Sequence, residues 1–114
     1  TIDLLVSHVV GTYAKKFPQE FASRAQEWHA SSHFWLHRSL LIYQLKFKQE
    51  TNLDLLQFYI HSFKWNKEFF VQKAIGWSLR EVSKWNPAWV RQIVEQEGLT
   101  GLAKREALKY AALV

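Results

Sequence analysis

Four side chains on one predicted helix have a spacing that suits contact with an anionic partner. Residues 69–85 have the apolar spacing of a helix, and along it Lys73, Trp77, Arg80 and Lys84 follow at intervals of four, three and four residues. At about 100° per residue these positions form one continuous stripe. Cations in such a stripe can neutralise phosphates, and the indole can pack against a ring or a cation. The alternative is a solvated basic face with Trp77 half in the core.

Asp3 and Arg38 occupy positions equivalent to that of Lys73 in a predicted helical repeat. At an offset of 35 residues, the hydrophobic pattern and the helix breakers of three successive segments agree. We therefore predict that Asp3, Arg38 and Lys73 line up across one face, with Trp77 one turn beyond Lys73. The helical neighbours of Arg38 are apolar, and a buried guanidinium needs a carboxylate or a phosphate. Its partner is either a bound phosphate or Asp3, which would make a structural ion pair between repeats.

Lys46 and Lys48 form a second basic group near the end of a predicted helix over residues 33–48. Together with Arg80 and Lys84 they would form a rim of phosphate contacts around an aromatic-lined cleft. The alternative is that they serve solubility and helix capping, because the helix dipole favours lysines at C-terminal ends.

Three histidines, His29, His33 and His37, are spaced by four, as ligands of a metal on one helix can be. Ser31 and Ser32 should break the helix between the first two, and no carboxylate or cysteine stands beside the others. We therefore expect no metal site. The chain has no cysteine, which excludes disulfides and thiolate chemistry, and it has no glycine-rich phosphate loop or nucleophile elbow.

Helices must position these residues. The 114 residues are 48% hydrophobic with only 4 Gly and 2 Pro, which argues against a β fold with many tight turns. Apolar spacing predicts seven helices and no strand, at about residues 1–16, 18–30, 33–48, 53–63, 69–85, 87–98 and 102–113. Helix 33–48 is apolar nearly all round and should be buried. In helix 69–85 one broad arc, which includes Phe70, Ile75 and Leu79, should face the core.

Polar residues and helix breakers mark the predicted helix ends. We expect Pro18 and Pro87 to begin helices and Gly98 to end one. The expected N-caps are Ser31 with Ser32, Thr51 with Asn52, Asn66, and Asn86.

Helical hairpins that repeat every 35 to 45 residues stack into an α-solenoid with a concave binding surface. We therefore predict an all-α superhelix of HEAT-like hairpins that forms a single domain over residues 1–114. A net charge of +5 and a pI near 9.6 favour an anionic partner. No apolar run approaches the length of a membrane span, so we expect no membrane contact. The chain starts at Thr1 and contains no Met, which indicates part of a longer protein.

Five segments together resemble the AlkD-type DNA alkylation repair glycosylases. They are WLHR at residues 35–38, QLKFK at 44–48, KEFFVQKAIGW at 67–77, LRE at 79–81 and KREA at 104–107. The similarity covers essentially the whole chain, and residues 67–81 are close to a family signature. Members of that family are HEAT-like α-solenoids of roughly twice this length. The resemblance thus implies that this chain is a C-terminal half.

The resemblance also implies an activity, namely hydrolysis of the N-glycosidic bond of cationic N3- or N7-alkylated purines in duplex DNA, with no cofactor or metal. The family's catalytic carboxylate falls on Asp3, its active-site arginine on Arg38 and one of its two active-site tryptophans on Trp77. Its phosphate-contacting residues correspond to Lys46, Lys48, Arg80 and Lys84. The second tryptophan would lie upstream of Thr1, so the fragment by itself would lack part of the active surface.

This chemistry is physically reasonable for these residue types. A cationic purine is a good leaving group, so a carboxylate at Asp3 need only stabilise the developing sugar cation and position a water. Trp77 would pack on the lesion, and Arg38 would hold a phosphate and keep Asp3 ionised. We expect a bacterial, cytoplasmic monomer that associates with the nucleoid when bound to DNA. The alternative function is a non-catalytic HEAT-repeat scaffold that binds DNA or protein.

Overall fold

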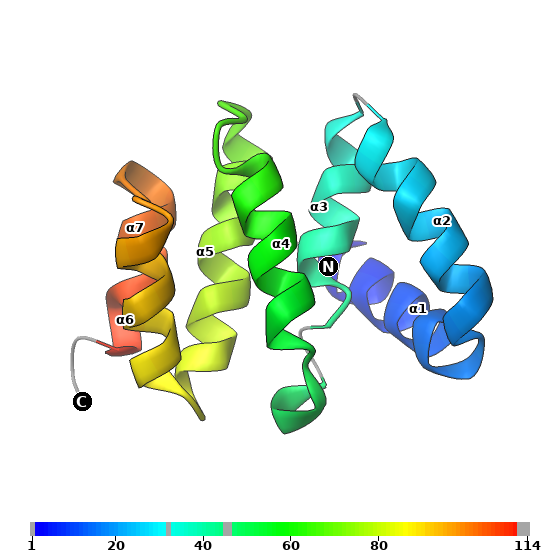
Figure 1. The fold of residues 1–114 in the computed structure, drawn as a ribbon, viewed down its shortest axis with the longest axis horizontal. Helices are drawn as coiled ribbons and strands as arrows, with labels where there is room; N and C mark the ends of the chain where they lie inside the picture. Colours follow the sequence, from blue (N-terminus) through cyan, green and yellow to red (C-terminus); the bar gives the residue numbers. More distant parts are fainter. Residues whose placement is uncertain (1, 32, 45–46, 112–114) are drawn as a thin grey trace.

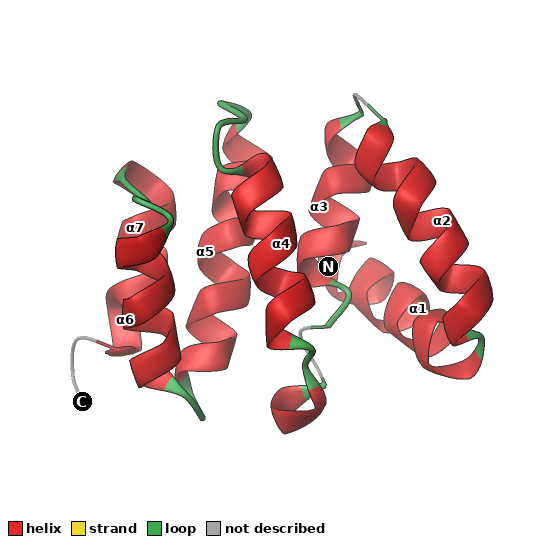
Figure 2. Cartoon of the chain, in the orientation of Figure 1, coloured by secondary structure: helices red, strands yellow, loops and turns green. Residues whose placement is uncertain are grey.

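Seven α-helices and no strand make up the part of the chain that the computed structural model describes, residues 2–31, 33–44 and 47–111 (Figures 1 and 2). For residues 2–7, 110 and 111 it describes the backbone alone. The helices are α1 (Ile2–Lys16), α2 (Pro18–Ala30), α3 (Phe34–Ile42), α4 (Leu53–Phe63), α5 (Phe69–Ser83), α6 (Pro87–Gln96) and α7 (Gly101–Ala111). A short 3-10 helix, η1 (Lys48–Glu50), lies between α3 and α4. The predicted all-α fold is confirmed.

The helices form two layers. α1, α3, α5 and α7 form a row in which each helix packs on the next, while α2, α4 and α6 lie on the other side of that row (Figure 1). Successive hairpins therefore stack side by side, as in an α-solenoid. None of the helices in the described ranges is long and apolar enough to cross a bilayer.

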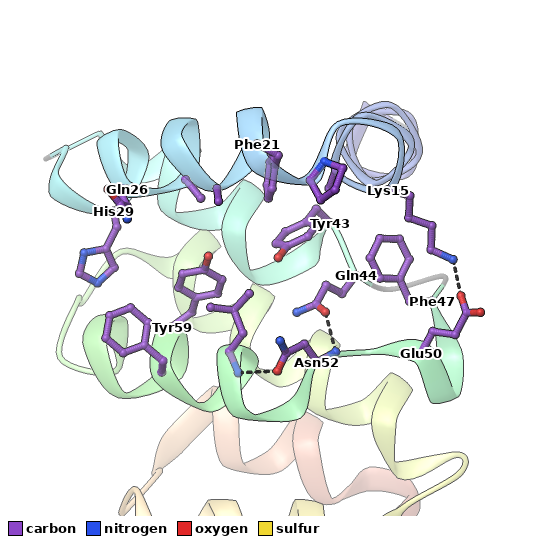
Figure 3. Close-up of a pocket in the computed structure, with 16 residues that line it drawn as sticks. Lys15, Phe21, Gln26, His29, Tyr43, Gln44, Phe47, Glu50, Asn52 and Tyr59 are labelled. Atoms are coloured by element: carbon purple, nitrogen blue, oxygen red, sulfur yellow. Dashed lines mark hydrogen bonds and ion pairs between the residues drawn. The ribbon is translucent and has the colours of Figure 1, made fainter.

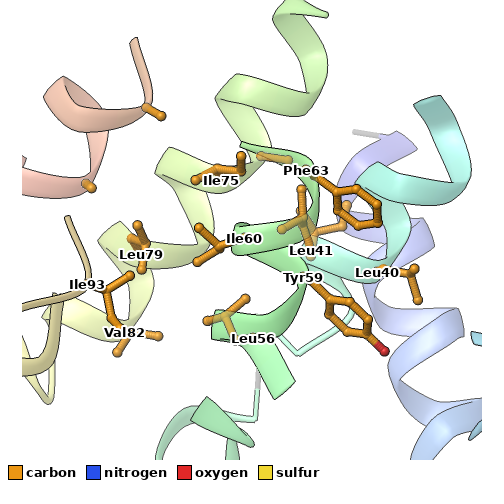
Figure 4. Packing of buried hydrophobic residues seen from close by; sticks show 14 of the residues in the cluster. Leu40, Leu41, Leu56, Tyr59, Ile60, Phe63, Ile75, Leu79, Val82 and Ile93 are labelled. Carbon is orange, nitrogen blue, oxygen red and sulfur yellow. The ribbon is translucent and has the colours of Figure 1, made fainter. Parts of the chain in front are cut away.

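Large aliphatic side chains of α3, α4 and α5 form the centre of the core (Figure 4). Leu40, Leu41, Ile60, Ile75 and Leu79 are at most 1% exposed. Each contributes about 1.5–3 kcal/mol by leaving water. This core fixes α3 and α5 side by side, and these two helices carry most of the predicted site.

Several predicted helix ends are confirmed. Pro18 and Pro87 are the first residues of α2 and α6. Asn52 accepts the Leu55 N–H at 3.1 Å and so caps α4, and Asn86 caps α6 in the same way. Gly98 has a φ of 62° just after α6, a conformation that glycine adopts without strain.

Two predicted caps are wrong. The N-cap of α5 is Glu68, and Asn66 instead accepts the Glu68 N–H at 2.9 Å in the turn before the helix. The N-cap of α3 is His33, whose Nδ1 accepts the Trp35 N–H at 3.3 Å. Ser31 accepts the His33 N–H, and Ser32 lies outside the described residues. In both places a side chain two residues before the observed cap bonds to the backbone of that cap.

The predicted helix 33–48 is too long. α3 ends at Ile42 with Tyr43 as its C-cap. The carbonyl of Gln44 then accepts the Phe47 N–H at 2.9 Å, and its side-chain Oε1 accepts the Asn52 N–H at 2.8 Å. These bonds replace helical ones and start the turn into η1, where Lys48 has a φ of 52°.

Candidate functional site

The three predicted catalytic positions lie on three neighbouring helices of one layer. Asp3 is in α1, Arg38 in α3 and Trp77 in α5, and each of these helices packs on the next. The repeat therefore places them as the sequence predicts, at the level of the elements. The side chain of Asp3 lies outside the described residues, so its pairing with Arg38 stays a prediction.

Arg38 is buried and held from α5. Only 2% of the residue is exposed, its Nη1 donates to the carbonyl oxygen of Phe70, and its guanidinium carbon lies 5.7 Å from the centre of the Phe70 ring. The predicted burial of this arginine is confirmed. A guanidinium held in this way has a fixed direction within the α3–α5 contact.

Trp77 and Lys73 differ in exposure although they share one stripe of α5. Trp77 is partly buried against the core, while Lys73 is exposed with its Nζ 5.9 Å from the centre of the Phe69 ring. One position is therefore fixed by packing and the other is open to a ligand. This exposure agrees both with the predicted binding stripe and with its alternative, a solvated basic face with Trp77 half in the core.

The other predicted phosphate-binding residues differ in whether they already pair with carboxylates of the chain. Arg80 bonds to Glu106 of α7 at 3.2 Å, and Lys84 pairs with Glu81 at 3.1 Å. Lys48 is exposed in η1, which lies toward the same end of the molecule as the C-terminus of α5 (Figure 1). Lys46 lies outside the described residues. The stripe is thus partly neutralised by carboxylates of the chain itself.

An aromatic group at the N-terminal ends of α3 and α5 was missed. Trp35, Phe69 and Phe70 are 45%, 54% and 41% exposed, and the rings of Trp35 and Phe70 stack with centres 5.8 Å apart. The prediction that Phe70 faces the core and that helix 33–48 is buried all round is wrong here, because these residues occupy first turns that project beyond the core. Helical spacing indicates the face on which they lie but not their exposure: Trp35 is three residues before Arg38, and Phe70 is seven before Trp77.

The three spaced histidines have partners within the fold. His29 shares a hydrogen bond with Ser62 at 2.8 Å, His33 caps α3, and the Nε2 of His37 bonds to the carbonyl of Ser31. In the described ranges no group of three or more His, Asp or Glu side chains is arranged to hold a metal ion. The charged and aromatic groups on α3 and α5 therefore define the candidate site.

Taken together, these groups suit an anionic polymer that carries ring systems. A buried guanidinium and an exposed ammonium supply fixed and mobile positive charge, and partly exposed aromatic faces lie between them. Aromatic faces attract cationic or electron-poor rings, and the cations attract phosphates.

Comparisons with known proteins agree with this chemistry. A family model described as DNA alkylation repair enzyme matches residues 1–111. A solved structure of a predicted DNA alkylation repair enzyme from Enterococcus faecalis has a TM-score of 0.81 and 39% identity, over 92% of this chain and 49% of that one. The chain thus spans about half the length of that relative. No curated protein matches it. Because the family model covers nearly the whole chain, the chain belongs to the DNA alkylation repair enzyme family.

Proposed function

We propose that this chain acts in DNA repair as part of a glycosylase that hydrolyses the N-glycosidic bond of cationic N3- or N7-alkylated purines in duplex DNA. Family membership supports the repair role. The observation that carries the finer proposal is the buried Arg38, which α5 holds in place between the helices that bear Asp3 and Trp77. Desolvation of a guanidinium is costly unless the group is held by hydrogen bonds or charges, and here the Phe70 carbonyl of α5 accepts one such hydrogen bond.

In this proposal the substrate supplies much of the driving force. The alkylated purine already carries a positive charge, so it can leave without a general acid. Asp3 stabilises the oxocarbenium-like sugar and orients the attacking water. Trp77 packs on the lesion or its sugar, and Arg38 binds a backbone phosphate next to the reacting nucleotide.

Phosphate contacts along α5 and η1 would grip the backbone around the lesion. Lys48 and Lys73 are exposed and can bind directly. Arg80 and Lys84 would exchange their carboxylate partners, Glu106 and Glu81, for phosphates. We assign Lys46 to the same contact set on the resemblance alone. The proposed gripping needs no deep base pocket.

The direct test is release of N7-methylguanine from methylated duplex DNA. It compares the full-length protein that contains this chain with its Asp3→Asn variant and with the 114-residue chain alone. Loss of the carboxylate should reduce release by at least a hundredfold, because the transition-state charge would lose its main partner. Binding to an intact duplex should change little.

A matched variant, Asp54→Asn, controls for loss of one carboxylate. Asp54 is exposed in the first turn of α4, in the layer away from the predicted site. It should leave base release unchanged. If the unsubstituted full-length protein binds DNA but releases no base, the glycosylase proposal is wrong and a DNA-binding scaffold takes its place.

A further inference from the structure

A pocket of about 730 Å³ opens between α2 and α4, away from the predicted catalytic residues (Figure 3). Its lining comes from α2, the end of α1, the segment after α3, η1 and α4. Asp3, Arg38 and Trp77 do not line it. Pockets that bind small molecules usually enclose roughly 300–1,000 Å³. The size therefore suits a compact ligand. The pocket lies apart from the three predicted catalytic residues, although η1, which carries the proposed DNA contact Lys48, borders it.

The walls of the pocket are largely apolar and aromatic. Phe21 and Ala25 of α2 and Leu55 and Phe58 of α4 line it, and Phe47 lies at one side (Figure 3). α2 packs on α1 and α3 rather than along α4, so these walls stand apart (Figure 1). Apolar and aromatic walls favour a ligand with flat, apolar rings.

Gln44 brings an unused hydrogen-bond donor to this pocket. The residue is 5% exposed, and its Oε1 accepts the Asn52 N–H. Its Nε2 is buried and has no hydrogen-bond partner among the described residues. In Figure 3 this nitrogen points toward the middle of the ring of lining residues. Buried amide nitrogens are rarely left without an acceptor. Water does not reach this nitrogen in the structure, so a ligand oxygen satisfies it when the amide turns into the open space of the pocket.

Two phenols add further donors. The hydroxyls of Tyr43 and Tyr59 point toward one another inside the pocket (Figure 3). Burial raises the pKa of Tyr43 far above its usual value and also raises the pKa of Tyr59. Both phenols are therefore neutral near pH 7. If one hydroxyl donates to the other, the second still has a hydrogen to give, so the interior offers more donors than acceptors.

The lining carries no excess charge. Lys15 and Glu50 are its two fully charged residues, and they pair with each other at one mouth. His29, at the other end, bonds to Ser62 and stacks on Phe58. An ionised ligand would find no unpaired counter-charge here, and its desolvation would not be compensated.

We propose that this pocket binds an uncharged aromatic small molecule that carries a carbonyl-type oxygen. The rings lie between the walls from α2 and α4, and the oxygen accepts hydrogen bonds from Gln44 and the tyrosine pair.

Nile red tests the proposal, because it is neutral, flat and aromatic, has a carbonyl oxygen and changes its emission when it leaves water. Titration of the 114-residue chain should give saturable binding of one dye per chain with a shift of emission to shorter wavelength. Ala22→Trp should weaken it, because Ala22 is an exposed lining residue and an indole there takes up part of the space between α2 and α4. Ser23→Trp is the matched control: Ser23 is exposed on the same helix but does not line the pocket, so binding should persist.

A second variant tests the polar contact. Gln44→Glu keeps an oxygen that can accept the Asn52 N–H and replaces the donor nitrogen by an oxygen, so affinity for the dye should fall at least three- to tenfold, the worth of one neutral hydrogen bond. Circular dichroism must give the same helix content for all variants. Absence of saturable binding, or equal binding by the Ala22→Trp and Ser23→Trp proteins, overturns the proposal, since the dye would then sit elsewhere.

Discussion

Arg38 is the residue whose surroundings constrain the site most. It carries a full charge at 2% exposure, and α5 supplies both the carbonyl and the ring that hold it. Charged groups are rarely buried to this degree without compensation, because their desolvation costs several kcal/mol. The fold thus buries a side chain with a high desolvation free energy in the contact between α3 and α5.

Replacing Arg38 by Met should affect both stability and activity. Loss of the charged donor should lower the free energy of unfolding by about 1–3 kcal/mol, and loss of its phosphate contact should reduce base release by the full-length protein. Urea unfolding and a base-release assay measure the two effects. Arg24→Met is the control, since Arg24 is exposed on α2 and its ion pair is with the exposed Glu27. If the two variants show the same unfolding free energy and the same base release, Arg38 is not part of the site.

Glu97 ties the ends of α4 and α6 together through a nearly buried carboxylate. Its side chain is 8% exposed and bonds to His61 at 2.8 Å and to Lys64 at 3.2 Å. Burial raises the pKa of the Glu97 carboxyl, but hydrogen bonds from His61, Gln57 and Lys64 outweigh it, so the pKa lies below its usual value of 4.5. The contribution to stability is therefore complete above pH 4.5 and is lost as the pH falls through the folded-state pKa.

A Glu97→Gln variant should show this pH dependence. At pH 7 it should be less stable than the unsubstituted chain by about 1–3 kcal/mol, because charge-assisted bonds are lost. The difference should shrink below pH 4.5, where the carboxylate of the parent takes up its proton. Urea unfolding at a series of pH values measures it. Glu27→Gln, in an exposed pair with Arg24, should give a small and flat difference. If the difference in unfolding free energy between Glu97→Gln and the parent does not change with pH, the stabilising role assigned to the Glu97 carboxylate is wrong.

Sequence reasoning at the residue scale succeeds where burial follows from neighbours along the helix. Arg38 is flanked by apolar residues at helical spacing, so its burial could be predicted. Exposure at helix ends could not. Phe70 and Trp35 match apolar positions of their helices, yet each lies in a first turn where the neighbouring element no longer covers it. Periodicity assigns a face of a helix but not how far the core extends along it.

At the scale of elements, the end of α3 shows what a pattern leaves undetermined. Apolar residues continue at helical spacing through residues 33–48, so hydrophobicity gives no signal for a boundary. The boundary depends on Gln44, whose side chain bonds to the backbone of Asn52, eight residues later. By contrast, Pro18, Pro87 and Asn52 act on their own local backbone, and their helix starts were predicted correctly. Local chemistry could be predicted, whereas a tertiary hydrogen bond could not.

The close packing of α5 on α7 depends on Gly76. A Cβ at this position would lie 2.6 Å from the Cβ of Glu106 and 3.2 Å from the carbonyl oxygen of Ala103. Gly76→Ala should therefore force the two helices apart. It should cost about 1–3 kcal/mol from overpacking, more than the roughly 1 kcal/mol that alanine gains as a better helix former.

Chemical unfolding of the Gly76→Ala variant measures the balance. The same displacement should disturb the Arg80–Glu106 bond between these helices, which is 3.2 Å in the parent. A matched substitution is Ser23→Ala on the exposed face of α2, where propensity acts without packing. A gain in stability for Gly76→Ala like that expected for Ser23→Ala would contradict the packing argument.

At the scale of the whole molecule, the predicted DNA contacts and the uncharged pocket lie mostly on different helices. The predicted DNA contacts lie on α1, α3, α5 and η1, while α2 and α4 form the main walls of the pocket, which the end of α1 and η1 also border. The net charge of +5 alone cannot distinguish a binding surface from general solubility. What distinguishes them is the placement of the cations, because only those that touch phosphates release counterions when DNA binds.

Salt dependence of duplex binding therefore tests the placement. The slope of log affinity against log salt should lose about 0.9 per phosphate contact removed, so Lys48→Gln with Lys73→Gln should make it shallower by about 1.8. Arg24→Gln with Arg91→Gln removes the same net charge from α2 and α6, the layer away from the predicted contacts, and should leave the slope nearly unchanged. Fluorescence anisotropy of a labelled duplex at several salt concentrations, with the full-length protein, gives both slopes. If both pairs reduce the slope equally, binding follows total charge and the stripe on α5 is not a specific surface. If only the first pair does, the phosphates lie along α5 and η1, beside the buried Arg38.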